Sequence, residues 1–124
     1  MKLEDQVVSL ELAKRLKELG VKQESLWVWV YGLTDANKES ESWFVTDEDN
    51  ASNWSNEGDR YSAFTVAELG EMLPENHYTL RYEGIWYGEF WKGPDHYDIC
   101  GEIDTEANTR AKMLIHLKEG HDGA

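Results

Sequence analysis

Residues 78–91 read YTLRYEGIWYGEFW, and this stretch predicts a β-hairpin. Apolar and polar side chains alternate over residues 78–82, which is typical of a strand with one exposed face. The aromatic-rich residues 85–91 predict a second strand, because aromatic side chains are enriched in pleated sheets. Glu83 and Gly84 lie between the two strands and predict a tight turn. This hairpin is therefore expected to form part of an antiparallel sheet.

Other stretches predict further strands on either side of the hairpin. Residues 27–31 read WVWVY, with aromatic side chains on one face and valines on the other. Because both faces are apolar, this strand is expected to be central and covered on both sides. Residues 43–46 are expected to pair back on it as a hairpin arm. Residues 97–101 are expected to form a fourth or fifth strand after a turn at residues 93–95.

Two helices have clear boundary signals. Ser9 can cap a helix whose leucines recur every three or four residues, and Gly20 can end it. Thr65 and Glu68 form a capping box, in which each side chain satisfies a backbone N–H of the other residue. It predicts a short helix that Pro74 stops.

A last helix is predicted to begin near Asp104 or Thr105 and to end at Gly120, which leaves a frayed tail at residues 121–124. The chain is therefore predicted to form a single α+β domain over residues 1–124. Its antiparallel sheet of about four to five strands is expected to be packed by the N- and C-terminal helices, with one short helix besides.

The net charge of this chain is concentrated in its middle. The 124 residues include 12 basic and 25 acidic side chains, a formal net charge of −13. Residues 39–106 hold three basic and 17 acidic side chains, a net charge of −14, and both flanking regions are nearly neutral. Direct binding to nucleic acid or to an anionic membrane is disfavoured, because affinity for phosphate comes from Lys and Arg. A localised excess of carboxylates is instead a candidate surface for a basic partner.

An acidic loop at about residues 47–60 is the strongest part of this surface. Its carboxylates could mimic the spaced phosphates of DNA and occupy a basic channel. One alternative is a solvated loop without a partner. Another is a calcium site, which would be irregular because Ser52 and Gly58 stand where an EF-hand needs Gly and Glu. The candidate partner-binding residues of the loop are Asp47, Glu48, Asp49, Trp54, Glu57 and Asp59.

Six tryptophans and six tyrosines are more than a domain of this size can bury at its centre. Most are expected in the core, and Trp43, Trp54, Tyr87 and Trp91 are candidates for an exposed patch. Tyr87 and Trp91 complete the set of predicted partner-binding residues, because Trp and Tyr dominate interface hot spots. A sugar-stacking platform is the competing interpretation of the same patch.

Catalytic groups are sparse. His96, Asp98 and Cys100 share a face if residues 97–101 form a strand. His96 and Cys100 would then lie about 13 Å apart, too far for a direct hydrogen bond, and a metal would need ligands from elsewhere. A buried, inert Cys100 is the simpler interpretation. We therefore expect no enzyme activity, no cofactor and no metal site.

Five stretches of the chain together resemble an uncharacterised family of small proteins carried by bacteriophages and other mobile elements. They are residues 8–20, 23–26, 64–74, 104–107 and 110–117. The resemblance implies a bacterial host cytoplasm and a gene pool rich in counter-defence proteins, and it assigns no site residues. A single cysteine also fits a reducing cytosol. The N-terminus lacks the order of a signal peptide, and no apolar run is long enough to span a bilayer.

The sequence thus predicts a non-enzymatic acidic interaction protein that binds a basic surface on a host protein. The sharpest version is a DNA mimic that inhibits a host nucleic-acid-binding or defence protein, as anti-CRISPR proteins do. The alternative is a small-ligand or carbohydrate-binding module that uses a Trp-rich sheet face. The partner and the oligomeric state stay open at this point.

Overall fold

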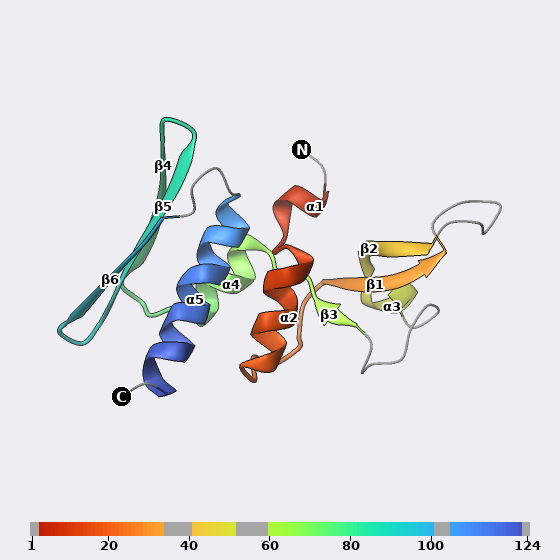
Figure 1. The fold of residues 1–124 in the computed structure, drawn as a ribbon, viewed down its shortest axis with the longest axis horizontal. Helices are drawn as coiled ribbons and strands as arrows, with labels where there is room; N and C mark the ends of the chain where they lie inside the picture. The colour runs from red at the N-terminus through yellow and green to blue at the C-terminus, as the bar shows by residue number, and fades with distance from the viewer. Residues whose placement is uncertain (1–2, 34–40, 52–59, 101–104, 123–124) are drawn as a thin grey trace.

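The structure is a computed structural model that describes residues 3–33, 41–51, 60–100 and 105–122. These residues form an α+β fold, as predicted (Figure 1). The helices are α1 (Leu3–Gln6), α2 (Leu10–Glu18), α3 (Glu48–Ala51), α4 (Val66–Met72) and α5 (Glu106–Asp122). The strands are β1 (Trp27–Leu33), β2 (Glu41–Asp47), β3 (Tyr61–Ser62), β4 (His77–Tyr82), β5 (Ile85–Lys92) and β6 (Asp95–Cys100).

The prediction of one sheet of four or five strands is wrong. The described strands form two antiparallel sheets of three strands each, in the orders β2-β1-β3 and β4-β5-β6. Helices α1, α2, α4 and α5 lie between the two sheets (Figure 1). The split has a local cause, because β4, β5 and β6 each pair with their nearest neighbour in the chain through tight turns. Only the two-residue strand β3 returns to pair with β1.

In the first sheet, β1 is the central strand, and its hairpin with β2 runs from Trp27 opposite Asp47 to Leu33 opposite Glu41. The valine face of β1 is buried, as expected. The aromatic face turns towards the helices, and the indole N–H of Trp29 donates a hydrogen bond of 2.8 Å to the carbonyl of Val8. Cover on this face is incomplete, because Tyr31 is exposed.

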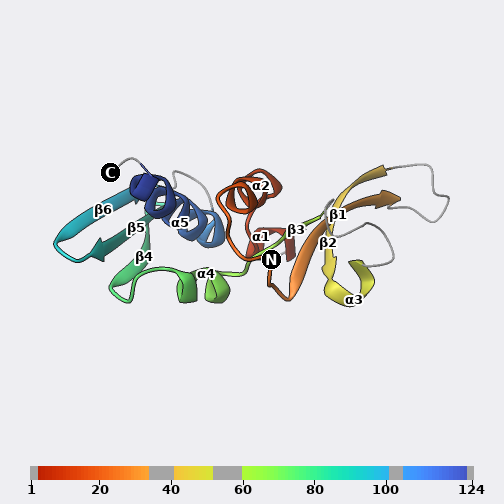
Figure 2. The ribbon, with the colours of Figure 1, turned by 90° about the horizontal axis from the view of Figure 1, so that it is seen from below.

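The second sheet is built from two hairpins. Glu83 and Gly84 both adopt positive φ in the turn between β4 and β5. Glycine at position 84 adopts this conformation without steric cost. The inner face of the sheet packs against α5, where the Phe90 ring is fully buried and Gly88 contacts Met113. No described helix or strand lies over the opposite face (Figures 1 and 2).

The helix starts follow the predicted caps. The Ser9 hydroxyl accepts from the N–H of Leu12, and Thr65 and Glu68 form both bonds of a capping box. The predicted end of the last helix is wrong, because α5 continues through Gly120 to Asp122 and includes half of the expected tail. The sequence signals also miss the four-residue helices α1 and α3, and α3 stands where the acidic loop was expected to begin.

The main core lies between the helices and the inner face of the second sheet. Its largest buried side chains come from α2, α4, α5, β5 and the segment before α4. They are Leu16, Phe64, Leu69, Phe90, Met113 and Leu114. A smaller cluster holds Val28 and Val30 of β1, with Phe44 packed against them. One sheet face therefore remains outside both clusters.

Candidate functional site

The outer face of the second sheet, which no described helix or strand covers, is the candidate site. Strand pairing sets its composition, since Tyr78 lies opposite Glu89, and Trp91 lies opposite His96. Side chains at alternate positions of the three strands share this face. Its members with described side chains are Tyr78, Leu80, Tyr82, Ile85, Tyr87, Glu89, Trp91, His96 and Asp98.

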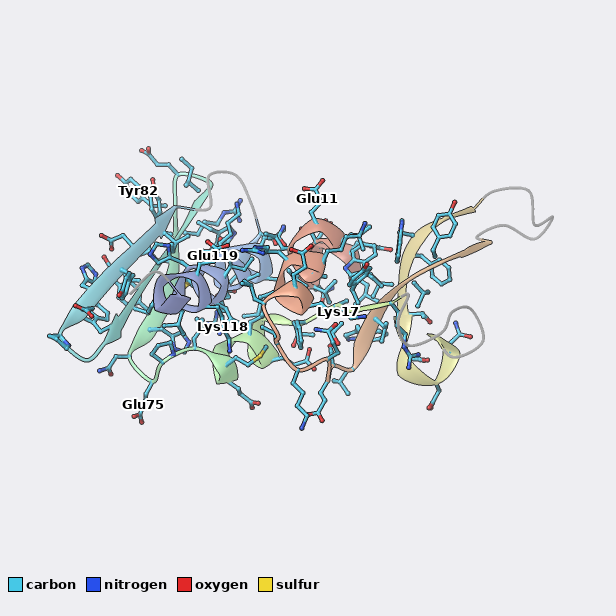
Figure 3. The ribbon with its side chains drawn as sticks, turned by 60° about the horizontal axis from the view of Figure 1, so that its bottom comes forward. Glu11, Lys17, Glu75, Tyr82, Lys118 and Glu119 are labelled. Atoms are coloured by element: carbon cyan, nitrogen blue, oxygen red, sulfur yellow. The ribbon has the colours of Figure 1, made fainter. Side chains whose placement is uncertain are left out.

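Large apolar side chains on the outer face remain open to solvent. Leu80 is 42% exposed, and Tyr82 is 63% exposed at the tip of the sheet (Figure 3). Tyr78 and Trp91 are 41% and 36% exposed. A group of exposed apolar side chains on one sheet face is typical of a binding site.

Aromatic rings run across this sheet from strand to strand. The centroids of the Tyr78 and Trp91 rings are 6.1 Å apart. The imidazole of His96 stacks on Trp91, with 4.7 Å between centroids and 22° between the ring planes. The outer face therefore has a stacked aromatic edge that holds the imidazole in place.

Next to these rings, Glu89, His96 and Asp98 form a polar cluster. His96 Nε2 lies 3.2 Å from Asp98 Oδ1 and 3.8 Å from Glu89 Oε1. One ligand atom from each of the three residues lies within 4.8 Å of those of the others. The hydroxyl of Tyr78 donates a hydrogen bond to the other oxygen of Glu89, Oε2. These residues could together hold a metal ion.

The Tyr78 hydrogen bond also moves the pKa of each partner further from neutral pH. By donating to the carboxylate, it lowers the pKa of Glu89, although partial burial opposes the shift. The same bond raises the pKa of Tyr78, because ionisation of the phenol would remove the donated proton. Near neutral pH the carboxylate is ionised and the phenol is neutral, and both shifts favour this state, which keeps the hydrogen bond intact.

Among the predicted partner-binding residues that the structure describes, the acidic and the aromatic ones lie at different sheets. Tyr87 and Trp91 lie on the outer face, as the alternation of their strand predicted. Asp47 and Asp49 are exposed beside the first sheet, on the other side of the helices (Figure 1). Asp47 has a structural role as well, because its Oδ1 accepts from the N–H of Asn50 and caps α3. Trp54, Glu57 and Asp59 lie outside the described residues, as does the side chain of Glu48.

Trp43 also lies away from the outer face. It is half-buried in the first sheet, 5.5 Å from Tyr31 and 5.8 Å from Tyr61 between ring centroids. The ammonium of Lys14 lies 5.2 Å from its ring centroid, in a cation–π contact. Trp43 therefore helps to hold α2 against the first sheet.

Sequence reasoning placed His96, Asp98 and Cys100 on one face of a strand, and the pairing of β6 agrees. Cys100 lies opposite Tyr87, and its side chain is outside the described part. The residue that sequence reasoning missed is Glu89, which β5 supplies directly opposite Asp98. The turn at residues 93–94 was the available signal, because a tight turn fixes which residues of two strands face each other.

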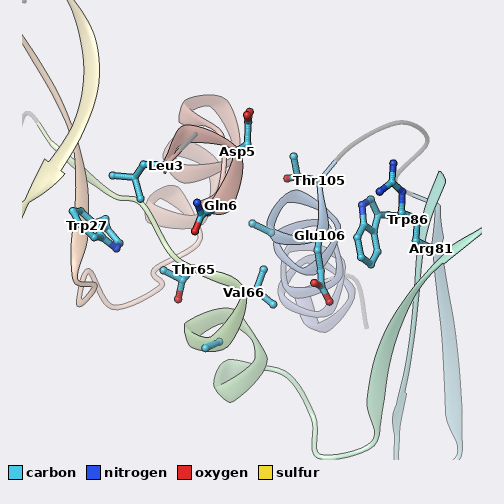
Figure 4. A pocket seen from close by; sticks show the side chains of 12 residues that line it. Leu3, Asp5, Gln6, Trp27, Thr65, Val66, Arg81, Trp86, Thr105 and Glu106 are labelled. Atoms are coloured by element: carbon cyan, nitrogen blue, oxygen red, sulfur yellow. The ribbon is translucent and has the colours of Figure 1, made fainter. Parts of the chain in front are cut away.

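A separate cavity of about 520 Å³ lies between the two sheets, near the N-terminal ends of α4 and α5 (Figure 4). Trp27 lines one side of it and Trp86 the other, with Val66 between them. Its polar groups include the hydroxyl of Thr65 and the guanidinium of Arg81. A volume of this order suits a small organic ligand.

Comparisons with known proteins find no matching family model, no matching curated protein and no matching solved structure. The phage-protein resemblance therefore stays a prediction. Among the described segments, no helix has both the length and the apolar character needed to cross a membrane.

Proposed function

We propose that this chain is a non-enzymatic interaction protein whose outer face binds a basic surface on a host protein. The observation that carries the proposal is the group of exposed apolar side chains on a sheet face that no described element covers. Tyr and Trp are the residue types most enriched at interface hot spots, and Trp91 and Tyr82 are both present here.

The charge around this face supports a basic partner. Glu89 and Asp98 lie among the aromatic side chains, and the exposed Asp95 and Glu83 lie in or beside the two turns at its ends. The strands belong to the segment of residues 39–106, which carries the whole net negative charge. A partner with exposed Lys and Arg would complement this surface and be steered towards it at low salt.

The test is capture of host proteins from a bacterial lysate by the immobilised chain and by two variants. The double variant Leu80→Ser and Tyr82→Ser removes apolar surface from the outer face. Tyr31→Ser is the matched control, because Tyr31 is also exposed but lies on the first sheet. The affinity of the captured partner, once purified, should fall at least about tenfold in the double variant and stay unchanged in the control. It should also weaken as salt is added.

Three results would contradict the proposal. They are equal affinity in the wild type and the double variant, loss of binding in Tyr31→Ser alone, and affinity that does not depend on salt.

A separate form of the proposal uses the predicted acidic loop in place of the outer face, and is a DNA mimic that inhibits a nucleic-acid-binding or defence protein. It is supported by the density of carboxylates in residues 39–106 and by the phage-protein resemblance. Its test replaces Asp47, Glu48, Asp49, Glu57 and Asp59 by Asn or Gln. If DNA binding by the captured partner is inhibited equally by this variant and the wild type, the acidic loop is not the mimic.

A small-ligand or carbohydrate-binding module is the second candidate function. It is favoured by the cavity between Trp27 and Trp86, whose lining combines apolar side chains with polar and charged ones such as Thr65 and Arg81. Titration with a panel of sugars and metabolites should change tryptophan fluorescence if this module exists, and a Trp86→Phe variant should alter that change. The interaction proposal predicts no change with any member of the panel.

A further inference from the structure

The polar cluster on the outer face combines three side chains with the chemistry of metal ligands. An imidazole and two carboxylates form a mixed nitrogen and oxygen donor set, which suits Zn²⁺ and other first-row transition metals. His96 and Asp98 come from the same face of β6, two residues apart, and Glu89 comes from the neighbouring strand. Two strands joined by a tight turn therefore supply all three donors.

The distances within this cluster are close to those of a metal site. Zinc bonds to nitrogen or oxygen of about 2.0–2.2 Å place tetrahedral ligands about 3.3–3.6 Å apart. The observed separations of 3.2 Å and 3.8 Å from His96 Nε2 bracket that spacing. Asp98 is the most exposed of the three, with 69% of its side chain open to solvent. Its carboxylate therefore has room to rotate towards that of Glu89 and bring all three ligand atoms around one ion.

The neighbours of the cluster orient two of its ligands. Trp91 stacks on the imidazole of His96 and restrains its ring plane. Tyr78 binds Oε2 of Glu89, while Oε1 is the oxygen that faces His96. Hydrogen bonds from a neighbouring residue to a metal ligand, such as that from Tyr78 to Glu89, fix the orientation of the ligand. Their loss typically weakens metal binding by about 10–100-fold.

The strand register gives an independent reason for a cation at this point. Glu89 and Asp98 lie directly opposite each other on paired strands. Like charges in this position destabilise a sheet, because their carboxylates are held only a few ångströms apart. The ion pairs of both carboxylates among the described residues are with His96. A divalent ion bound by all three residues would relieve this repulsion more fully than an imidazole can.

We propose that Glu89, His96 and Asp98 bind one divalent transition-metal ion such as Zn²⁺. The remaining coordination positions face solvent, as they do in sites that keep an open position. The inference goes beyond the proposed function and is tested on this chain alone, so it can fail without affecting the proposal about a partner.

The experiment titrates the purified full chain with Zn²⁺ in competition with a colorimetric chelator, and repeats the titration with Co²⁺ to read its visible absorption bands. The wild type should bind one ion and show bands of a nitrogen and oxygen site. His96→Gln and Glu89→Gln should each weaken binding at least tenfold, and Tyr78→Phe should weaken it about tenfold.

Two matched controls separate this cluster from general surface charge. Asp95→Asn removes an exposed carboxylate at the start of the same strand, and His116→Gln removes an exposed imidazole on α5. Both should bind Zn²⁺ as the wild type does, and circular dichroism and thermal melting should show that every variant is folded. Failure of the wild type to compete for Zn²⁺, or equal affinity in His96→Gln and the wild type, would overturn the proposal.

Discussion

The two sheets of this protein are both rich in aromatic residues but use their faces differently. In the first sheet, the valine face of β1 is buried and its Trp29 side chain bonds to the backbone before α2. In the second sheet, Phe90 is buried on the inner face and its neighbour Trp91 is exposed on the outer face. Helices α1, α2, α4 and α5 lie between the two sheets, so the outer face of the second sheet has no described helix over it (Figure 1). An apolar face left open is therefore the part of the fold that packing alone does not explain.

The largest loss of stability is expected for Phe90→Ala, which tests whether the inner face of β5 is packed more tightly than its outer face. This ring is fully buried and stacks on Tyr97 with 4.8 Å between centroids, so its removal leaves a cavity. We expect the free energy of unfolding to fall by about 3–5 kcal/mol. Urea denaturation measures the loss, and Trp91→Ala on the outer face of the same strand is the control. Equal losses in the two variants would show that both faces are packed.

A smaller loss is expected for Gly88→Ala, which tests how closely α5 approaches the inner face. A Cβ at this position would meet the Sδ of Met113, so the substitution overpacks the core and should cost about 1–3 kcal/mol of unfolding free energy. The cost should shrink in a Met113→Val background, because the shorter side chain leaves room. An unchanged cost in both backgrounds, measured by urea denaturation, would mean that α5 does not pack on Gly88.

Trp29→Phe tests the corresponding packing of the first sheet. It keeps an aromatic ring but leaves the carbonyl of Val8 without its indole donor, so we expect a loss of about 1–3 kcal/mol. Thermal denaturation monitors the loss, with Tyr31→Phe as a control at an exposed position of the same strand. If the two variants melt together, the indole bond does not hold the first sheet to the segment before α2.

The smallest change in stability is expected for Leu80→Ser on the outer face. Because its side chain is 42% exposed, the unfolding free energy should change by no more than about 0.5 kcal/mol. Urea denaturation measures this change as well. A loss as large as that of Gly88→Ala would show that the free protein already covers this face, for example by self-association.

Much of the local structure could be predicted from the sequence. The hairpin over residues 78–91, the cap at Ser9 and the capping box at Thr65 depend on neighbouring residues alone, and all are present. The division into two sheets was missed, because alternation predicts strands but not their partners, and the open edge of β1 pairs with β3 and not with β4, β5 or β6. The end of α5 was missed because a glycine lowers helix stability without always ending a helix.

The sequence predicted which residues of the candidate site share a strand face, but not how the two strands face each other. Alternation predicted that Tyr87 and Trp91 share a face of one strand, and that His96 and Asp98 share a face of the next strand. The meeting of these two groups depends on the register of β5 and β6, which decides that Glu89 faces Asp98. In the sequence, Glu89 is one of 25 acidic residues, and only the position of the turn at residues 93–94 indicates that it faces Asp98.

Hydroxyl-radical footprinting of the chain, free and bound to its captured partner, would show which sheet the partner covers. We predict strong labelling of Tyr82, Trp91 and Tyr31 in the free protein, because all three side chains are at least one-third exposed. In the complex, Tyr82 and Trp91 should be protected, and Tyr31 on the first sheet should be labelled as before. Protection of Tyr31, with Tyr82 and Trp91 still labelled, would contradict the assignment of the outer face as the binding surface.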